Sequence, residues 1–178
     1  AALLAVIGGR QLPPAVPDTP APPAVPDTPA PSTNPPECVG RLVMSGGLSL
    51  SWLHRMFSAA APRLSFEAMT ALAEGVPWGA RGVSFVPFLE CSASPHAQSR
   101  ARGLFGGLSS STSAGEMIQA VMEGVAFNVL QCLQMFEARG AKIAEVRLAE
   151  GGARIDRWCQ ILADILQRPI VRLGHLNT

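Results

Sequence analysis

The sequence predicts an α/β fold, and three observations support this prediction. Residues 145–150 (EVRLAE) and 169–173 (PIVRL) have the composition of short strands, and an amphipathic helix lies between them. A strand–helix–strand unit of this length is typical of a right-handed parallel crossover. A long helical pattern over residues 113–140 precedes the unit, so helices and strands alternate along the chain.

Composition limits the classes of function. The chain has 178 residues, of which 48% are hydrophobic and 15% charged, so a single domain with an apolar core is expected. The net charge of +1 provides no basic field for nucleic acid or an anionic membrane, and neither is expected as a partner. No run reaches the roughly 18 apolar residues of a spanning helix. The first ten residues lack the basic start of a signal peptide.

The cysteines do not predict a metal site. Cys38, Cys91, Cys132 and Cys159 form no CxxC pair, and the three histidines are equally scattered. A zinc site usually needs paired ligand spacings, so none is expected. Isolated thiols are typical of a reducing compartment, which favours a cytoplasmic location.

A proline-rich segment precedes the globular part. Residues 13–21 read PPAVPDTPA, and residues 22–30 repeat the same nine letters. Proline lacks an amide donor and fixes φ, so polyproline II structure or disorder is expected. We therefore divide the chain into a low-complexity segment (residues 1–37) and a globular part (residues 38–178). A proline-recognition motif is the alternative to a linker, but the interleaved charges are acidic, which favours the linker.

The globular part starts with two predicted helices and a strand. Apolar residues recur three and four apart over residues 46–57, which predicts a helix. A second helix is predicted over residues 65–77, where Ser65 can cap the start and a glycine and a proline can close the end. Residues 82–88 (GVSFVPF) predict a buried strand, and residues 89–112 a loop.

The long helix has clear sequence signals at both ends. Ser113 and Glu116 fit a capping box, and Gly140 suits a left-handed stop. Gly124 in its middle costs about 1 kcal/mol relative to alanine. We therefore predict that another element passes very close to the helix at Gly124.

The glycine pair Gly151–Gly152 follows the predicted strand 145–150 and precedes the predicted helix 155–166. Ligands of open parallel sheets bind beyond the carboxyl ends of the strands, and glycine lets them approach the backbone. The amides that open the next helix could hold a phosphate or nucleotide. The alternative is a tight corner without a ligand. The spacing matches neither GxGxxG nor GxxxxGK[ST], so both readings stay open.

Four stretches in order resemble one family. GGLSLSWLHRMF, FVPFL with SPHAQSRARGLFGGL, IQAVMEGVAFNV, and VRLAEGGARIDRWCQILADILQRPIV resemble the C-terminal domain of FGGY carbohydrate kinases, the xylulokinase branch most of all. The resemblance covers about residues 40–172. It implies an actin-like, ribonuclease-H-like ATPase domain, here incomplete. It also implies phosphoryl transfer from ATP to a ketose hydroxyl, with Mg²⁺ and an aspartate base.

The resemblance carries candidate site residues. The family holds the adenosine side of ATP on a GGGARS turn, which matches Gly151, Gly152, Ala153 and Arg154. The first glycine of that motif is Glu150 here, and a carboxylate at this point would oppose a phosphate. The serine after the arginine is Ile155, which removes a helix cap or a polar contact.

Two functions are weighed. The first is the nucleotide-side domain of a sugar kinase, using ATP and Mg²⁺ by resemblance. A sugar such as D-xylulose would be its substrate only if an N-terminal domain is supplied. The second is a non-catalytic pseudoenzyme fragment or interaction module. The sugar-binding domain and its aspartate lie outside these residues, so no catalytic residue or metal ligand is assigned, and the chain alone is expected to be inactive. Missing strands would expose a sheet edge, so self-association is expected.

Other polar and aromatic residues have simpler expected roles. His96 is expected to be a hydrogen-bonded loop residue, and Asp164 to lie on the polar face of its helix. Glu123 is expected to be a solvated or packing-edge carboxylate, with a contact to a metal-bound water as the alternative. Core or rim positions are expected for Trp52, Trp78 and Trp158, which do not form a basic-aromatic surface for nucleic acid.

Overall fold

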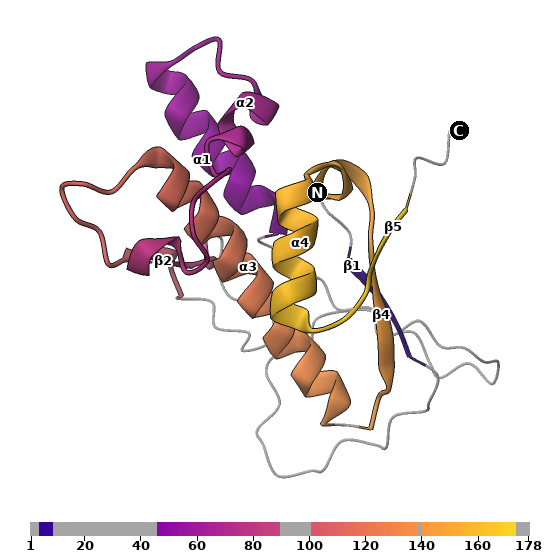
Figure 1. Cartoon of the computed structure of the whole chain (residues 1–178). Helices are drawn as coiled ribbons and strands as arrows, with labels where there is room; N and C mark the ends of the chain where they lie inside the picture. The colour runs from indigo at the N-terminus through magenta and orange to yellow at the C-terminus, as the bar shows by residue number, and fades with distance from the viewer. Residues whose placement is uncertain (1–3, 9–45, 90–100, 139, 174–178) are drawn as a thin grey trace.

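The structure is a computed structural model, which describes residues 4–8, 46–89, 101–138 and 140–173 (Figure 1). Its helices and strands are β1 (Leu4–Gly8), α1 (Gly46–Ala60), α2 (Phe66–Ala71), β2 (Ser84–Val86), β3 (Leu104–Gly106), α3 (Ala114–Glu137), β4 (Ile143–Leu148), α4 (Asp156–Leu166) and β5 (Ile170–Arg172). Two 3₁₀ helices are η1 (Ala80–Gly82) and η2 (Glu150–Arg154). From α3 to β5 helices and strands alternate as predicted, and the α/β class is confirmed.

A three-stranded sheet has the order β1-β4-β5. β4 and β5 are parallel, with Val146 opposite Ile170, and α4 connects them, so the predicted crossover is confirmed. β1 pairs antiparallel with β4, with Leu4 opposite Leu148. This strand was not predicted, because residues 4–8 were assigned to the proline-rich segment. Its backbone pairs with one edge of β4.

A hairpin of β2 and β3 forms a separate two-stranded sheet, with Phe85 opposite Phe105. The prediction of a continuous loop over residues 89–112 was therefore wrong for β3. Three residues are too few for a readable period, and the strand is held by its aromatic neighbours. The rings of Phe85 and Phe105 lie 4.7 Å apart, and Trp52 stacks on both.

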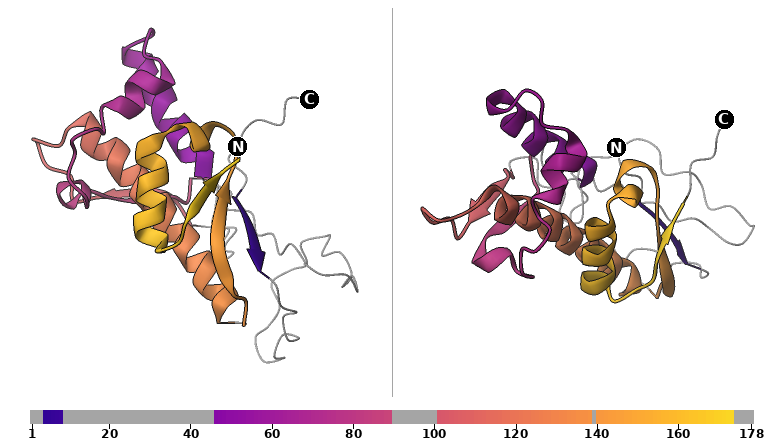
Figure 2. Two further views of the ribbon diagram at one scale, coloured as in Figure 1. Left: turned by 45° about the vertical axis from the view of Figure 1, so that its right-hand side comes forward. Right: turned by 45° about the horizontal axis from the view of Figure 1, so that its top comes forward.

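Two helices, α3 and α4, lie against the three-stranded sheet. α3 and α4 pack side by side, and the three strands lie on one side of this pair in all views (Figures 1 and 2). α1 and α2 both pack against α3, near its amino-terminal half (Figure 1).

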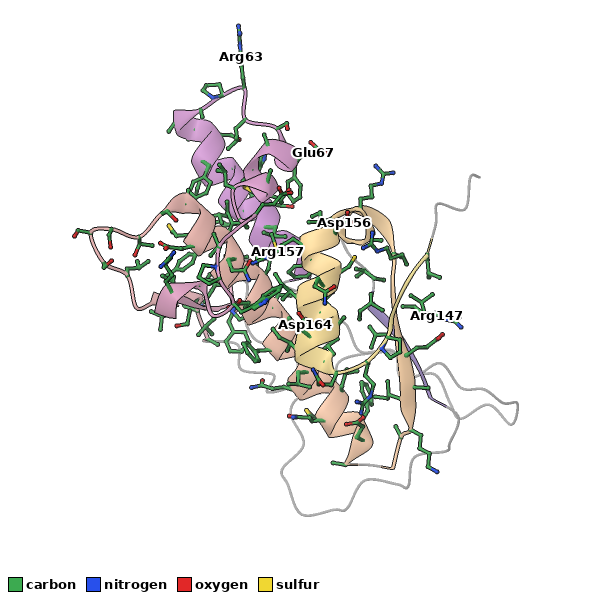
Figure 3. The ribbon with its side chains drawn as sticks, viewed as in Figure 1. Arg63, Glu67, Arg147, Asp156, Arg157 and Asp164 are labelled. Carbon is green, nitrogen blue, oxygen red and sulfur yellow. The ribbon has the colours of Figure 1, made fainter. Side chains whose placement is uncertain are left out.

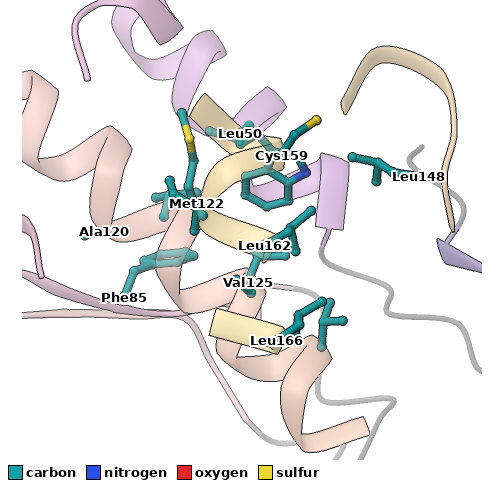
Figure 4. Packing of buried hydrophobic residues seen from close by; sticks show 14 of the residues in the cluster. Leu50, Phe85, Ala120, Met122, Val125, Leu148, Cys159, Leu162 and Leu166 are labelled. Carbon is teal, nitrogen blue, oxygen red and sulfur yellow. The ribbon is translucent and has the colours of Figure 1, made fainter. Parts of the chain in front are cut away.

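One buried cluster joins α1, α3, α4 and β4 (Figure 4). Leu53, Met122 and Leu162 are almost fully buried. Trp158 also belongs to this core, Trp52 is half-buried, and Trp78 is 54% exposed. The three tryptophans therefore occupy core and rim positions, as predicted.

The predicted helix ends are largely confirmed. In the capping box of α3, the Glu116 amide donates to Ser113 Oγ at 3.2 Å and the Ser113 amide donates to Glu116 Oε2 at 2.7 Å. Gly140 follows with φ of +88°. α2 is shorter than the predicted helix over residues 65–77. The Thr70 hydroxyl donates to the carbonyls of Phe66 and Glu67, and such local bonds favour tight turns over further helix.

Candidate functional site

The candidate site is the segment between β4 and α4, residues 150–154, which we call the glycine turn. All five residues form one 3₁₀ helix, η2, which follows the carboxyl end of β4. β4 is the central strand of its sheet and has the parallel neighbour β5. Ligands of parallel sheets bind at this position, so the location matches the expectation from sequence.

Gly151 leaves the backbone of the glycine turn open. The residue is exposed, and its φ lies outside the left-handed region that favours glycine. A Cβ added to Gly151 would meet no heavy atom within 4 Å. Neither backbone strain nor internal packing therefore requires glycine here, and a ligand can approach the peptide group from outside.

The other predicted residues anchor the turn or face solvent. Ala153 is buried, with 8% of its surface exposed, whereas Arg154 is exposed. The Cys159 thiol donates to the carbonyls of Gly152, at 3.8 Å, and Ala153, at 3.7 Å. The turn is thus fixed on its inner side and open at Gly151. The expected effect of the Glu150 charge stays a prediction.

The first turn of α4 lacks a side-chain cap. Ile155 is the N-cap residue, and no side-chain hydrogen bond caps the helix. The departure that the sequence indicated at Ile155 therefore has the expected structural consequence. Asp156 follows in the first turn and accepts a hydrogen bond from Arg172 Nη1 at 2.6 Å. The amides at this helix end have no acceptor from their own cap residue, which suits a polar or anionic ligand.

The thiol of Cys159, which contacts the glycine turn, has a raised pKa and so favours the protonated form. Burial raises the pKa of the Cys159 thiol, the positive charge of Arg172 opposes this rise, and Asp156 adds to it. Neither Cys159 nor Cys132, the two cysteines within the described part of the chain, forms a disulfide. A buried protonated thiol is a weak hydrogen-bond donor and a poor nucleophile, and the contacts of Cys159 with the carbonyls of Gly152 and Ala153 anchor the turn.

Glu123, expected to be a solvated or packing-edge carboxylate, occupies the packing position and is not solvated. The side chain is only 8% exposed, and Oε1 accepts from the Gly79 amide at 2.9 Å and from Gln119 Nε2 at 2.7 Å. The carboxylate therefore fixes the chain at Gly79 against α3. Asp164 is exposed on α4, as predicted, and accepts from Gln160 at 2.8 Å. His96 lies outside the described residues.

Two surface hollows lie away from the glycine turn. The hollow of about 280 Å³ is formed by the Trp78 loop, α3 and α4, and it is mostly apolar. The second, of about 250 Å³, lies between the η1–β2 segment and α3. Neither of these two hollows is lined by a residue of the glycine turn.

Residues 4–8, 46–89, 101–138 and 140–173 contain no group of three potential metal ligands among histidine, cysteine, aspartate and glutamate. Within the same ranges, every helix is too short or too polar to cross a bilayer.

Sequence reasoning missed Arg157 and Gln119. Arg157 lies in the first turn of α4, on the side that faces α3 (Figure 3). Its Nε donates to Gln119 Oε1 at 3.1 Å. The one available signal was the spacing of Gln119 and Glu123, four residues apart on one helix face.

Comparison with known proteins gives consistent matches. The model of the FGGY family of carbohydrate kinases, C-terminal domain, matches residues 38–178. A xylulose kinase of Bacillus subtilis is 33% identical over 134 residues, which cover 75% of this chain and 26% of that protein. A gluconokinase of Bacillus licheniformis is 33% identical over 141 residues, which cover 75% of this chain and 28% of that protein.

A solved structure gives the same result. The crystal structure of xylulose kinase from Rhodospirillum rubrum superimposes with a TM-score of 0.64 at 30% identity, over 73% of this chain and 26% of that one. The chain thus spans about a quarter of the length of the relatives it matches.

Proposed function

Because the chain belongs to the FGGY family of carbohydrate kinases, as part of their C-terminal domain, we propose that it forms the nucleotide side of the active site of an ATP-dependent sugar kinase. Phosphoryl transfer needs both walls of a closed cleft to align ATP with the hydroxyl that it phosphorylates. The proposed activity therefore requires a sugar-binding domain, and residues 38–178 alone supply only one wall.

The open backbone at Gly151 carries the proposal. We assign the adenosine side of ATP to the glycine turn, with contacts from Gly151, Gly152, Ala153 and Arg154. Gly151 is exposed and has no internal packing that requires a glycine. The turn lies at the carboxyl end of a central strand, and the next helix begins without a side-chain cap. All three properties favour a ligand that approaches the main chain.

ATP and Mg²⁺ fit the described residues to different degrees. Kinases of this family use both, and the open turn offers main-chain groups for ATP. The part of the chain that the structure describes brings no three acidic, histidine or cysteine side chains together. We assign neither a metal ligand nor a catalytic base to these residues, because kinases bind Mg²⁺ largely through the phosphates of ATP and water. When bound, Mg²⁺ would neutralise phosphate charge.

For the substrate we propose a ketose resembling D-xylulose. Four of the curated relatives with the strongest matches are xylulose kinases, and gluconokinases match at similar identity. The sugar would be held by the complementing domain. Since the reaction consumes ATP, we place it in the cytoplasm. The comparisons give no support to the alternative of a pseudoenzyme fragment.

Self-association is part of the proposal. In the order β1-β4-β5, β1 and β5 are the edge strands of the described sheet, and we assign the pairing edge to β5, whose residues Ile170 and Val171 are half-buried. An edge strand with apolar residues can pair with a second copy of the chain.

Calorimetry with ATP and Mg²⁺ tests the nucleotide site on the full chain. We expect saturable heat, and no heat at millimolar ATP would contradict the proposal. A coupled ADP-release assay with D-xylulose then tests catalysis. We expect turnover only after addition of the sugar-binding domain of an FGGY kinase. Turnover by the chain alone would contradict the proposal that residues 38–178 form only one side of the active-site cleft.

A further inference from the structure

We propose that Arg157 is a positioning residue for the glycine turn. It holds the first turn of α4, and with it residues 150–154, against α3 and the loop at Trp78. This inference rests on the proposed function, because it concerns the same nucleotide site. It adds a residue that contacts no ligand but fixes the geometry of the groups that do.

Arg157 makes three contacts that join α4 to two other parts of the chain, α3 and the loop that contains Val76 and Trp78. Its Nε donates to Gln119 Oε1 of α3 at 3.1 Å, and its Nη2 donates to the carbonyl oxygen of Val76. Its Cζ lies 4.1 Å from the ring centroid of Trp78, a cation–π arrangement. The planar guanidinium makes these contacts at once, which a lysine ammonium cannot reproduce.

A buried network continues from Arg157 into α3. Gln119 is fully buried, and its Nε2 donates to Glu123 Oε1, which also accepts from the Gly79 amide. The Gln119 side-chain amide thus connects the guanidinium of Arg157 to the buried carboxylate of Glu123 by hydrogen bonds. Removing Arg157 would leave the buried Gln119 oxygen without its donor, and such unpaired groups are costly.

The position of Arg157 explains why the glycine turn should depend on it. The residue lies in the first turn of α4, three positions after Arg154. Ile155 provides no side-chain cap, so the start of this helix is fixed mainly by tertiary contacts. A ligand held by main-chain groups depends on their placement to within a fraction of an ångström.

Arg168 provides a matched control at the other end of α4. Its Nη2 donates to Glu137 Oε1 of α3 at 2.7 Å, and its Nε donates to the Ile143 carbonyl at 3.1 Å. Both arginines therefore join α4 to α3, but only Arg157 lies beside the glycine turn. A general loss of helix packing should follow from either substitution.

Amide hydrogen exchange of the ligand-free full chain, compared among wild type, Arg157→Met and Arg168→Met, tests the inference. We expect Arg157→Met to speed exchange in residues 150–156 about tenfold, through local opening, and Arg168→Met to leave this segment within about twofold of wild type. Equal effects of the two variants on the segment, or no effect of Arg157→Met, would overturn the proposal.

Nucleotide affinity gives a second readout. We expect Arg157→Met to weaken ATP binding about tenfold, because the main-chain groups that would hold ATP lose their fixed placement, and Arg168→Met to leave it unchanged. Arg157→Lys keeps the charge without the planar fork and should recover less than half of the loss in exchange protection. If Arg157→Met does not fold, Arg157→Lys carries the test, and wild-type exchange and affinity in this variant would overturn the proposal.

The two proposals fail separately. Exchange is measured without nucleotide, so absent ATP binding would reject the nucleotide site and leave the exchange result decisive for Arg157. Normal ATP binding by Arg157→Met with unchanged exchange would reject the positioning role alone.

Discussion

Gly124 on α3 lies directly against the backbone of Phe85 on β2. A Cβ added to Gly124 would be 2.1 Å from the Phe85 carbonyl oxygen. The sequence predicted such a close approach, because glycine in the middle of a long helix needs a reason, and the prediction is confirmed. Gly151 differs from Gly124 in this respect, because a Cβ added to Gly151 would meet no heavy atom within 4 Å.

Substitution at Gly124 should destabilise the fold. We expect Gly124→Ala to lower the free energy of unfolding by about 2 kcal/mol, because the clash is with backbone and outweighs the roughly 1 kcal/mol gain in helix propensity. Chemical denaturation measures this change. Gly151→Ala is the control and should leave stability nearly unchanged. Equal stability of Gly124→Ala and wild type would show that the hairpin moves away without penalty.

The capping box of α3 should contribute measurable stability. Ser113→Ala removes the acceptor for the Glu116 amide, which lies 3.2 Å from Ser113 Oγ. We expect the free energy of unfolding to fall by about 1 kcal/mol. Ser110→Ala, an exposed loop substitution, should change it by less than about 0.5 kcal/mol. Similar values for the two variants would argue against the cap.

Cys159 should make stability depend on alkaline pH. Burial raises the pKa of its thiol above the ordinary value of 9.0, so the folded state favours the protonated form. This contribution is complete below pH 9.0 and is lost as the pH rises through the higher pKa of the folded state. We expect the free energy of unfolding to fall more steeply above this pH in wild type than in Cys159→Ala. Parallel pH profiles of the two proteins would contradict this assignment.

Self-association should depend on β5. Light scattering over a range of concentrations should give a mass that rises above 18.7 kDa. We expect Val171→Lys to reduce this rise, because a charge on an edge strand disfavours pairing with another edge. A monomer at every concentration would contradict the proposed association.

Local signals were sufficient to predict much of this fold. The capping box at Ser113, the helical periods and the unit β4–α4–β5 follow from residue spacing, and all are present. β1 was missed because its pairing with β4 joins residues far apart in sequence. β3 was missed because it has only three residues.

The candidate site was predictable only in part. The glycine turn could be located from Gly151 and Gly152, which follow a strand and precede a helix. The contacts that hold it could not, since Arg157 reaches Gln119 across 38 positions and Val76 across 81. Such contacts depend on the packing of α3 against α4, which no local pattern specifies.

ATP binding by Gly151→Leu, measured by calorimetry beside wild type, tests the central claim most directly. The added side chain meets no atom of the protein within 4 Å of its Cβ, so the variant should unfold at the same denaturant concentration as wild type. The side chain would occupy the face of the glycine turn that the nucleotide uses. We predict ATP binding at least about tenfold weaker than that of wild type. Wild-type ATP affinity in a folded Gly151→Leu protein would contradict the assignment of the nucleotide to this turn.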